Sequence, residues 1–333
     1  MAYAVRTQDL GKRFGDTEAL AHLNLNVEAG TVLGLLGHNG AGKTTAVRIL
    51  TTLALPTAGR AFVAGHDVVH SPAQARANLS LAGQQASLDE RLTGSENLRL
   101  LGRLQKLSKG SAFARADELL TRFGIEHAGD RQVGTYSGGM RRRLDLAACL
   151  VVHRPVVFLD EPTTGLDPAS RAEMWGAIEG LVADGAALVL TTQYLEEADR
   201  LADDIVVLSQ GRTVAAGTPA ELKARVGDRR VHVALPDTDA FAGAAQLLER
   251  LEPELDVRAR RLTLPAPDGP RDLRAALDAL EIAGIAVEEV SLSQPTLDDA
   301  FFALAGERGD DSRRARTSQG AIAQEAILPG EAA

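Results

Sequence analysis

The segment GHNGAGKTT at positions 37–45 contains the residues best suited to chemistry. Gly37, Gly42, Lys43 and Thr44 fit the pattern G-x-x-x-x-G-K-[ST]. Glycine lets backbone N–H groups turn toward phosphate oxygens, lysine reaches β- and γ-phosphates, and the threonine hydroxyl can ligate Mg²⁺. The segment therefore predicts a nucleoside triphosphate site. The alternative is an ordinary glycine turn before a helix.

Asp160 and Glu161 are the first carboxylates after the apolar run in PVVFLDEPTTGLDP. An acid at the end of a buried strand can hold Mg²⁺ through water, and the next acid can polarise an attacking water. By itself, such a pair is more often a helix cap or a solvated corner. Together with the glycine-rich segment, it favours a site that binds and hydrolyses a magnesium nucleotide.

A third group of candidate residues lies in TYSGGMRRRLDLAACL at 135–150. Ser137 and the two glycines after it open a predicted helix, and a helix N-terminus attracts anions. A plain helix cap is the alternative. The run Arg141–Arg143 is interpreted as a solvated or salt-bridged helix face rather than a nucleic-acid patch.

A parallel sheet is needed to bring these groups together. An apolar strand is predicted at 31–37, followed by the glycine-rich segment and a helix. Two further buried strands are predicted at 155–160 and 186–191, with a helix at 170–185 between them. Strand, helix and strand at this spacing imply a right-handed parallel crossover and hence an α/β fold.

The pattern along the chain predicts two domains. Residues 88–150 read as mainly helical, and 205–217 as a hairpin. We expect a first domain at 1–228, which contains the helical subdomain, and a small α+β domain with the order βαββαβ at 229–306. Residues 307–333 mix charge, alanine and glycine without periodicity, which predicts a disordered tail.

Composition restricts the partners of the protein. The 333 residues include 45 acidic and 36 basic side chains, a net charge of −9, so non-specific nucleic-acid binding is disfavoured. Cys149 is the only cysteine, which excludes an intramolecular disulfide and an all-cysteine metal site. No apolar stretch is long enough to span a bilayer, and the start has no hydrophobic signal core. We therefore expect a cytoplasmic protein whose membrane role, if any, depends on a separate chain.

Taken in order, the phosphate loop, YSGGM, FLDEPTTGLDP and a segment near Gln193 resemble an ATP-binding cassette (ABC) ATPase over about residues 3–220. The resemblance implies a P-loop NTPase fold and ATP hydrolysis coupled to transport. It also implies a head-to-tail homodimer with two ATP molecules at the interface. Each ATP would lie on one subunit's phosphate loop and beneath Ser137 and Gly139 of the other.

The resemblance also implies roles for single residues. Phe14 would stack on adenine, with a core position as the alternative. Gln84 would contact Mg²⁺ and the attacking water, although Gln85 beside it leaves the register open. Asp167 would cross the dimer interface, and Glu161 would be the general base. The full implied sets are Phe14, Gly37, Asn39, Gly40, Gly42, Lys43, Thr44, Thr45, Ser137, Gly138, Gly139 and Asp167 for ATP, Thr44, Gln84 and Asp160 for Mg²⁺, and Glu161, Gln193 and Gln84 for catalysis.

Gln193 departs from the family pattern, which usually has histidine at this position. Glutamine can donate a hydrogen bond to the γ-phosphate, but it carries neither a proton nor a positive charge near neutral pH. We expect Gln193 to sense the γ-phosphate while Glu161 performs the hydrolytic step. The alternative is that Gln193 caps the helix that follows it.

TTQYLEEADRLAD, GQQASLDERLTGSENL and LDDAFFALAG are similar to one narrower group, the daunorubicin/doxorubicin-resistance-type ATP-binding subunits of bacterial exporters. This similarity implies a separately encoded membrane permease, two copies of each chain and a position on the inner face of the cell membrane. It also implies efflux of a drug, antibiotic or other hydrophobic compound. The permease would dock around Leu88 to Leu101, and the second domain would support dimer assembly.

A soluble cassette ATPase that acts on DNA, chromosomes or ribosomes is the alternative function. Such proteins usually need a second cassette or a long coiled-coil insertion. No heptad repeat lies between Lys43 and Ser137, which makes this alternative less favourable. The sequence does not specify the cargo, because the ATPase does not touch it in this architecture.

Overall fold

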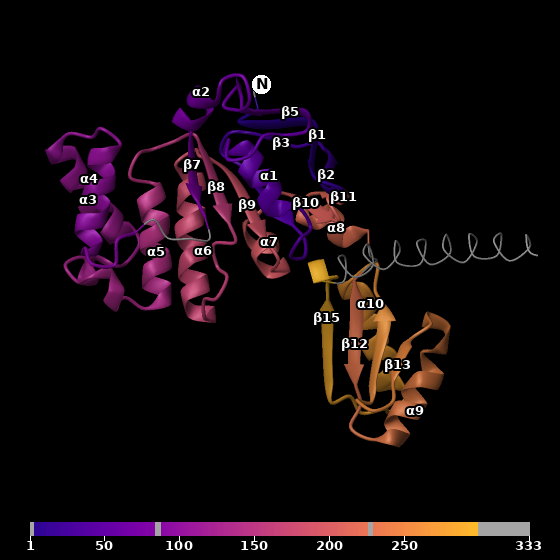
Figure 1. Ribbon diagram of the computed structural model, residues 1–333. Coiled ribbons are helices and arrows are strands. Elements are labelled where there is room, and N and C mark those ends of the chain that lie inside the picture. The colour runs from indigo at the N-terminus through magenta and orange to yellow at the C-terminus, as the bar shows by residue number, and fades with distance from the viewer. Residues whose placement is uncertain (1–2, 84–87, 226–228, 299–333) are drawn as a thin grey trace, which may run out of the picture. The chain divides into compact units, whose positions relative to one another are not determined.

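The computed structural model describes residues 3–83, 88–225 and 229–298. The chain divides into two compact units, Met1–Pro219 and Ala220–Ala333, so the division falls ahead of the boundary expected near residue 228. Among the described residues, no sheet is shared between the units (Figure 1), and each unit has its own hydrophobic core. The expected tail at 307–333 lies outside the described residues.

The first unit contains two sheets. The antiparallel sheet has the order β2-β1-β5-β6, with β3 beside β1; its strands are β1 (Val5–Phe14), β2 (Thr17–Leu23), β3 (Asn26–Val27), β5 (Ala58–Val63) and β6 (His66–Asp67). The second sheet has the order β11-β10-β4-β9-β8-β7; its strands are β4 (Val32–Leu36), β7 (Leu79–Ala82), β8 (Val156–Asp160), β9 (Ala187–Thr192), β10 (Asp204–Ser209) and β11 (Arg212–Gly217).

The second sheet is parallel from β10 to β7, which confirms the predicted α/β crossover. Every residue of β4, β8 and β9 is buried. Parallel strands are normally covered on both faces, which is why their sequences are continuous apolar runs. Only β10 and β11 pair in antiparallel fashion, as the predicted hairpin. Its turn residues Gln210 and Gly211 both have positive φ, the conformation that a two-residue hairpin turn favours.

Helix α1 (Lys43–Leu50) lies between the two sheets, where it contacts β2 and β5 on one side and β8 on the other. Its buried side chains join those of the strands in one core. The remaining helices of the unit are α2 (Pro72–Ala77), α3 (Gly94–Leu104), α4 (Lys109–Arg122), η1 (Glu126–Ala128), η2 (Val133–Thr135), α5 (Gly138–Cys149), α6 (Pro168–Ala183) and α7 (Leu195–Leu201).

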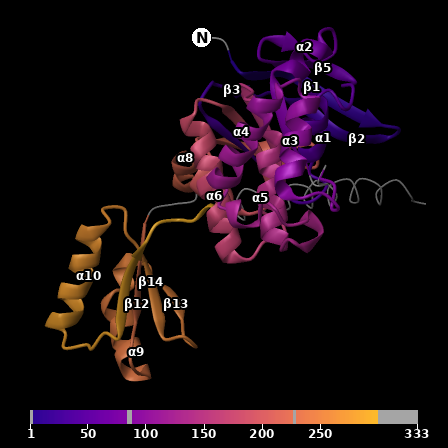
Figure 2. The ribbon, with the colours of Figure 1, turned by 90° about the vertical axis from the view of Figure 1, so that its left-hand side faces the viewer.

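The region expected to be helical, 88–150, contains α3, α4 and α5. Thr93 and Glu96 form a reciprocal capping box that starts α3, and α5 packs against β7 and α6. In Figure 2, α3 to α6 lie at the front of this unit, and β1, β2 and β5 are visible beside and above them. None of the helices formed by the described residues is long and apolar enough to cross a membrane.

The second unit has the predicted βαββαβ order. Its sheet is antiparallel with the order β13-β14-β12-β15, the arrangement of a ferredoxin-like split βαβ domain. Side chains of both helices pack on one face of the sheet to form the core. The elements are β12 (Arg230–Ala234), α9 (Thr238–Leu247), η3 (Glu249–Leu251), β13 (Glu254–Asp256), β14 (Arg261–Pro265), α10 (Pro270–Ile282) and β15 (Glu289–Ser293), preceded by α8 (Pro219–Ala224) at the division between the units.

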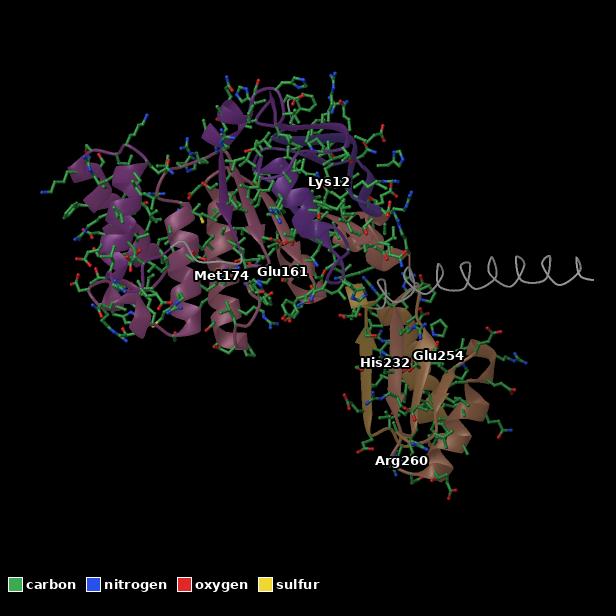
Figure 3. All side chains as sticks on the ribbon, viewed as in Figure 1. Lys12, Glu161, Met174, His232, Glu254 and Arg260 are labelled. Atoms are coloured by element: carbon green, nitrogen blue, oxygen red, sulfur yellow. The ribbon has the colours of Figure 1, made fainter. Side chains whose placement is uncertain are left out.

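The other face of this sheet is polar. His232 in β12 lies between the hydroxyls of Thr263 and Ser293, at 3.0 and 2.7 Å from its ring nitrogens. Arg230 pairs with Glu254 at 2.7 Å. Figure 3 shows His232 and Glu254 on neighbouring parts of this sheet. Alternation along each strand therefore places apolar side chains toward the helices and polar ones on the opposite side.

Candidate nucleotide-binding site

The glycine loop, residues 37–42, connects β4 to α1 as predicted. Gly42 has a φ of 109°, and a Cβ there would lie 2.7 Å from the carbonyl oxygen of Ala19. Gly40 has a φ of 81° with open space around its Cα. The loop therefore requires glycine at Gly42 for both conformation and close approach, which holds the backbone near the start of α1.

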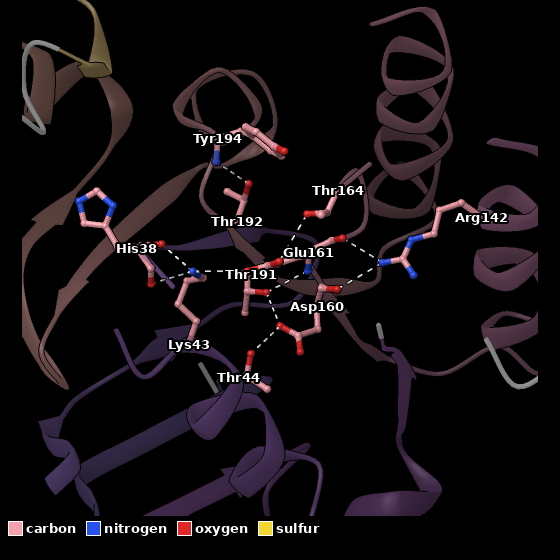
Figure 4. A network of polar contacts seen from close by, with 11 residues as sticks. His38, Lys43, Thr44, Arg142, Asp160, Glu161, Thr164, Thr191, Thr192 and Tyr194 are labelled. Atoms are coloured by element: carbon pink, nitrogen blue, oxygen red, sulfur yellow. Dashed lines mark hydrogen bonds and ion pairs between the residues drawn. The ribbon is translucent and has the colours of Figure 1, made fainter. Parts of the chain in front are cut away.

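Lys43 is nearly buried at 3% exposure, although it carries a charge. Its Nζ donates to the carbonyl oxygens of Gly37 and His38 at 2.5 and 3.2 Å, and lies 3.5 Å from Oε1 of Glu161 (Figure 4). A buried ammonium needs such partners, because desolvation without them is costly. Lys43 thus brings a positive charge to the carboxylate at the end of β8.

Asp160 and Thr44 meet beside this pair. Oδ1 of Asp160 accepts hydrogen bonds from the hydroxyls of Thr191 at 2.6 Å and Thr44 at 3.4 Å. The carboxylate is 5% exposed, so the two threonines satisfy an otherwise costly buried acid. An aspartate and a threonine hydroxyl offer the oxygen ligands that Mg²⁺ prefers.

These residues fit a magnesium ion bound with a nucleotide rather than a dedicated metal centre. Within the described part of the chain, no group of three or more His, Cys, Asp or Glu side chains could hold a metal ion. Mg²⁺ is typically held by one or two protein carboxylates together with waters and substrate phosphates. Asp160 and Thr44 match that incomplete set.

Glu161 has a strained backbone. Its φ is +53°, in the left-handed region that non-glycine residues adopt at a cost of roughly 1–2 kcal/mol. Its amide donates to the carbonyl oxygen and to the hydroxyl of Thr191 at 3.1 and 3.0 Å. Its Oε2 accepts from the Thr164 hydroxyl at 3.4 Å. The carboxylate is thereby held toward Lys43 instead of solvent.

A cavity of about 260 Å³ lies over the glycine loop. It is lined by Ala19, His38, Asn39, Gly40, Gly42, Lys43, Thr44, Thr45 and Glu161. Residues from β2, the glycine loop, α1 and the end of β8 therefore share one hollow. A second cavity, of about 440 Å³, lies on the α5 side of Glu161 and includes Gly138 and Arg142 in its lining.

Ser137 and Gly139 do not line the hollow that contains Lys43. Ser137 is the N-cap of α5, and its hydroxyl oxygen accepts from the Met140 amide at 3.2 Å. A Cβ on Gly139 would lie 2.6 Å from Oγ of Ser170, so α5 approaches the start of α6 closely there. Within one chain, the start of α5 and Lys43 thus line two different cavities, both of which Glu161 borders.

Asp167 caps α6. Its carboxylate accepts from the amide and the hydroxyl of Ser170, both at 2.9 Å. The backbone hydrogen bond from Ser170 is the main reason why the pKa of Asp167 lies below its ordinary value. The residue is an ionised cap at an exposed position.

Phe14 and Gln193 resolve two alternatives left by the sequence. Phe14 is 54% exposed at the end of β1, with Nζ of Lys12 4.8 Å from its ring centroid, so the core alternative is wrong. Gln193 lies between β9 and α7, partly exposed. The N-cap of α7 is Tyr194, so Gln193 is not the cap of that helix. Gln84 lies outside the described residues.

Residues 20–164 match the family described as ABC transporter. Daunorubicin resistance ATP-binding protein DrrA3 of Streptomyces coeruleorubidus is 50% identical over 310 residues, which cover 93% of this chain and 97% of that protein. The chain belongs to the ABC transporter family. Doxorubicin resistance ATP-binding protein DrrA of Mycobacterium tuberculosis is 48% identical over 295 residues, 87% of this chain and 89% of that protein.

Solved structures of ABC proteins share the fold. The structure of an ATP-binding subunit of an ABC transporter has a TM-score of 0.60 and 27% identity, and covers 67% of this chain and 92% of its own length. CbiO1 of Clostridium perfringens, part of the ABC transporter complex cbiONQ, has a TM-score of 0.63 and 25% identity, and covers 75% and 97%. The protein is an ABC-type ATPase subunit that binds ATP, of the kind that works with a membrane permease.

Sequence reasoning missed three residues of this ABC site. Thr191 holds Asp160 and Glu161, yet the only sequence signal is that the apolar run ending β9 stops at threonine. The arginine run was interpreted as one solvated or salt-bridged face. That holds for Arg141 and Arg143, which pair with Glu90 at 2.8 Å and Glu173 at 3.1 Å. It holds only in part for Arg142, which pairs with Asp145 at 3.6 Å but has a side chain that is 16% exposed and also donates to the carbonyl oxygen of Glu161.

Glu197 is the third missed residue. It is fully buried in α7, and its Oε1 accepts from Nε1 of Trp175 in α6 at 3.2 Å. Burial raises the pKa of the Glu197 carboxyl, and the hydrogen bond from Trp175 is among the contacts that offset part of that rise. The acid therefore lies where the segments that follow β8 and β9 meet α6. The sequence pattern LEEAD gave no means to tell Glu197 from its exposed neighbour Glu196.

Proposed function

We propose that the protein is the ATP-hydrolysing subunit of a bacterial exporter, active as a head-to-tail homodimer with MgATP at the interface. The observation that carries the proposal is the convergence of Lys43, Thr44 and Glu161 in one hollow, where Thr44 donates to Asp160. At about 260 Å³ the hollow is below the usual ligand pocket size of about 300–1,000 Å³. It therefore suits part of a nucleotide, with the remainder covered by a second copy.

The second copy would contribute the other anion site. Ser137 caps α5 at a helix N-terminus and does not line the Lys43 hollow of its own chain. A helix N-terminus favours a phosphate group through its unpaired N–H groups and its dipole. In a head-to-tail pair, Ser137, Gly138 and Gly139 of one copy would close over the ATP held by the other, and Asp167 would lie at the interface.

Each of the predicted site residues near the glycine loop would have a chemical task. Lys43 would bind β- and γ-phosphate oxygens, together with backbone N–H groups of residues 37–45. Thr44 and Asp160, with Gln84, would hold the Mg²⁺, which would neutralise phosphate charge. Glu161 would accept a proton from the attacking water, and Gln193 would donate a hydrogen bond to the γ-phosphate. Phe14 offers an exposed ring for adenine to stack on.

Export of a hydrophobic drug or antibiotic rests on the relatives, which are resistance proteins by name. A separate permease would bind near Leu88–Leu101, where Leu100 is 48% exposed beside the more exposed Leu104. A cleft of about 290 Å³ between β7, α3 and α5 adjoins this segment. The protein would then lie on the inner face of the membrane. We do not expect a nucleic-acid partner, because the net charge is −9.

Glu161→Gln tests the proposed function. The amide cannot accept the proton, so ATP turnover should fall roughly a hundredfold or more. Bound nucleotide should then persist, and size-exclusion chromatography with MgATP should show a dimer. Glu196→Gln, an exposed change of the same chemistry in α7, is the control. A Glu161→Gln protein that turns over ATP normally, or stays monomeric with MgATP, contradicts the proposal.

A further inference from the structure

Arg142 in α5 binds the backbone around Glu161 through three hydrogen bonds. Its Nε donates to the carbonyl oxygen of Pro162 at 2.8 Å, and one terminal nitrogen, Nη2, donates to those of Glu161 at 2.9 Å and Asp160 at 3.3 Å. A further terminal nitrogen donates to the carbonyl oxygen of Gly83 at 2.9 Å. Figure 4 shows this guanidinium pointing at the end of β8.

The three successive carbonyls belong to the strained turn. Glu161 has a φ of +53°, which unaided backbone disfavours. A planar guanidinium presents its donors in a rigid fork, so it can hold several oxygens in one fixed arrangement. Thr191 holds the amide of Glu161 from β9. The backbone of Glu161 is thus fixed from two elements that are separate from its own strand.

Arg142 also connects this turn to two other segments. It lies in α5, the helix that begins at Ser137, and Gly83 directly follows β7 and precedes Gln84. One side chain therefore joins α5, the end of β7 and the loop after β8. A shift of α5 would move the oxygens that set the backbone of Glu161.

We infer that Arg142 is a positioning residue for ATP hydrolysis: it holds the Glu161 turn in its reactive conformation and ties that turn to the helix of Ser137. The inference rests on the proposed function, in which Glu161 is the general base. Because Ser137 would serve the ATP of the opposite copy, Arg142 links the two nucleotide sites of the dimer through one chain. Arg142 itself does not line the Lys43 hollow.

The neighbouring arginine provides a matched control. Arg141 lies in the same helix, and its side chain, which is 36% exposed, pairs with Glu90 at 2.8 Å. Arg142 has an ion pair as well, with Asp145 at 3.6 Å, so loss of charge in α5 is common to substitutions at both positions. The carbonyl contacts distinguish them.

We would measure kcat and KM for ATP with the purified full-length protein carrying Arg142→Lys, Arg142→Gln or Arg141→Gln. Arg142→Gln should lower kcat by roughly tenfold to a hundredfold, since it removes several charged hydrogen bonds that fix the base. KM should change less than threefold, on the order expected when ground-state binding is retained. The kcat of Arg142→Lys should lie between those of the parent protein and Arg142→Gln, because one ammonium cannot hold three oxygens. Arg141→Gln should match the parent protein.

Chemical rescue separates positioning from a merely structural role. Arg142→Ala leaves space beside the cavity of about 440 Å³ that Arg142 lines, so added guanidinium at non-denaturing concentration should restore part of kcat. Arg141→Ala should show no such gain. A normal kcat in Arg142→Gln, or a folded Arg142→Ala protein without rescue, overturns the inference. Neither result affects the proposed function, which fails only if Glu161→Gln retains normal turnover or remains monomeric with MgATP.

Discussion

The two units both place polar side chains on a sheet, but they use them differently. In the first unit, β4, β8 and β9 are parallel, so their carboxyl ends meet at one edge and bring Lys43 and Glu161 within 3.5 Å. In the second unit, β12, β14 and β15 are antiparallel, and His232 lies mid-strand between two hydroxyls. The strand ends of the first unit bring charged side chains together in one hollow, whereas the sheet of the second unit distributes its polar side chains over a whole face. Parallel order is what makes a reactive site here.

The largest effect should come from charge at the parallel edge. Lys43→Ala removes the cation that would meet the phosphates, so we expect kcat/KM for ATP to fall by roughly 10²-fold or more. Arg230→Ala in the second unit breaks its pair with Glu254 and should leave kcat/KM unchanged. Steady-state kinetics on both variants provides the measurement. An equal loss of kcat/KM in the two variants would show that charge on the second unit's sheet matters to ATP turnover as much as charge at the parallel edge.

Glu197 should make the stability of the protein depend on pH. Burial raises its pKa above the ordinary value of 4.5, so the folded state retains a proton that the unfolded state loses. The stability that this proton contributes to the folded state is fully present below pH 4.5 and is lost as pH rises through the folded-state pKa of Glu197. Glu197→Gln mimics the neutral acid, so it should raise Tm most at alkaline pH and progressively less toward acid. A gain in Tm that is the same at every pH would contradict this assignment.

His232 should show the opposite sign and the smallest effect. Burial lowers its pKa below the ordinary value of 6.5, so the folded state binds the proton less readily. The stability from His232 is present above 6.5 and is lost as pH falls through the folded-state pKa. His232→Gln should therefore flatten the acid side of the Tm profile and change stability by about 1 kcal/mol near neutrality. A change in ATP turnover would instead connect this face to the site.

The sequence predicted the glycine loop, the carboxylates and the parallel strands because each depends on a local pattern. Glycines at fixed spacing, apolar runs and acids at strand ends act through backbone conformation and burial within a few residues. Arg142 could not be recognised in the same way. Three arginines in a row look alike, and only the packing of α5 against the end of β8 distinguishes the one that faces the turn.

By itself, the sequence determined which groups could bind phosphate and in what order the elements follow. The tertiary structure decided which of them meet. Thr44 and Asp160 are 116 residues apart in the chain, yet their oxygens lie within 3.4 Å because β8 ends beside the start of α1. The tertiary structure likewise buries Glu197 and leaves the neighbouring Glu196 exposed. Strand order and helix packing set such contacts, and neither is encoded in the spacing of neighbouring residues.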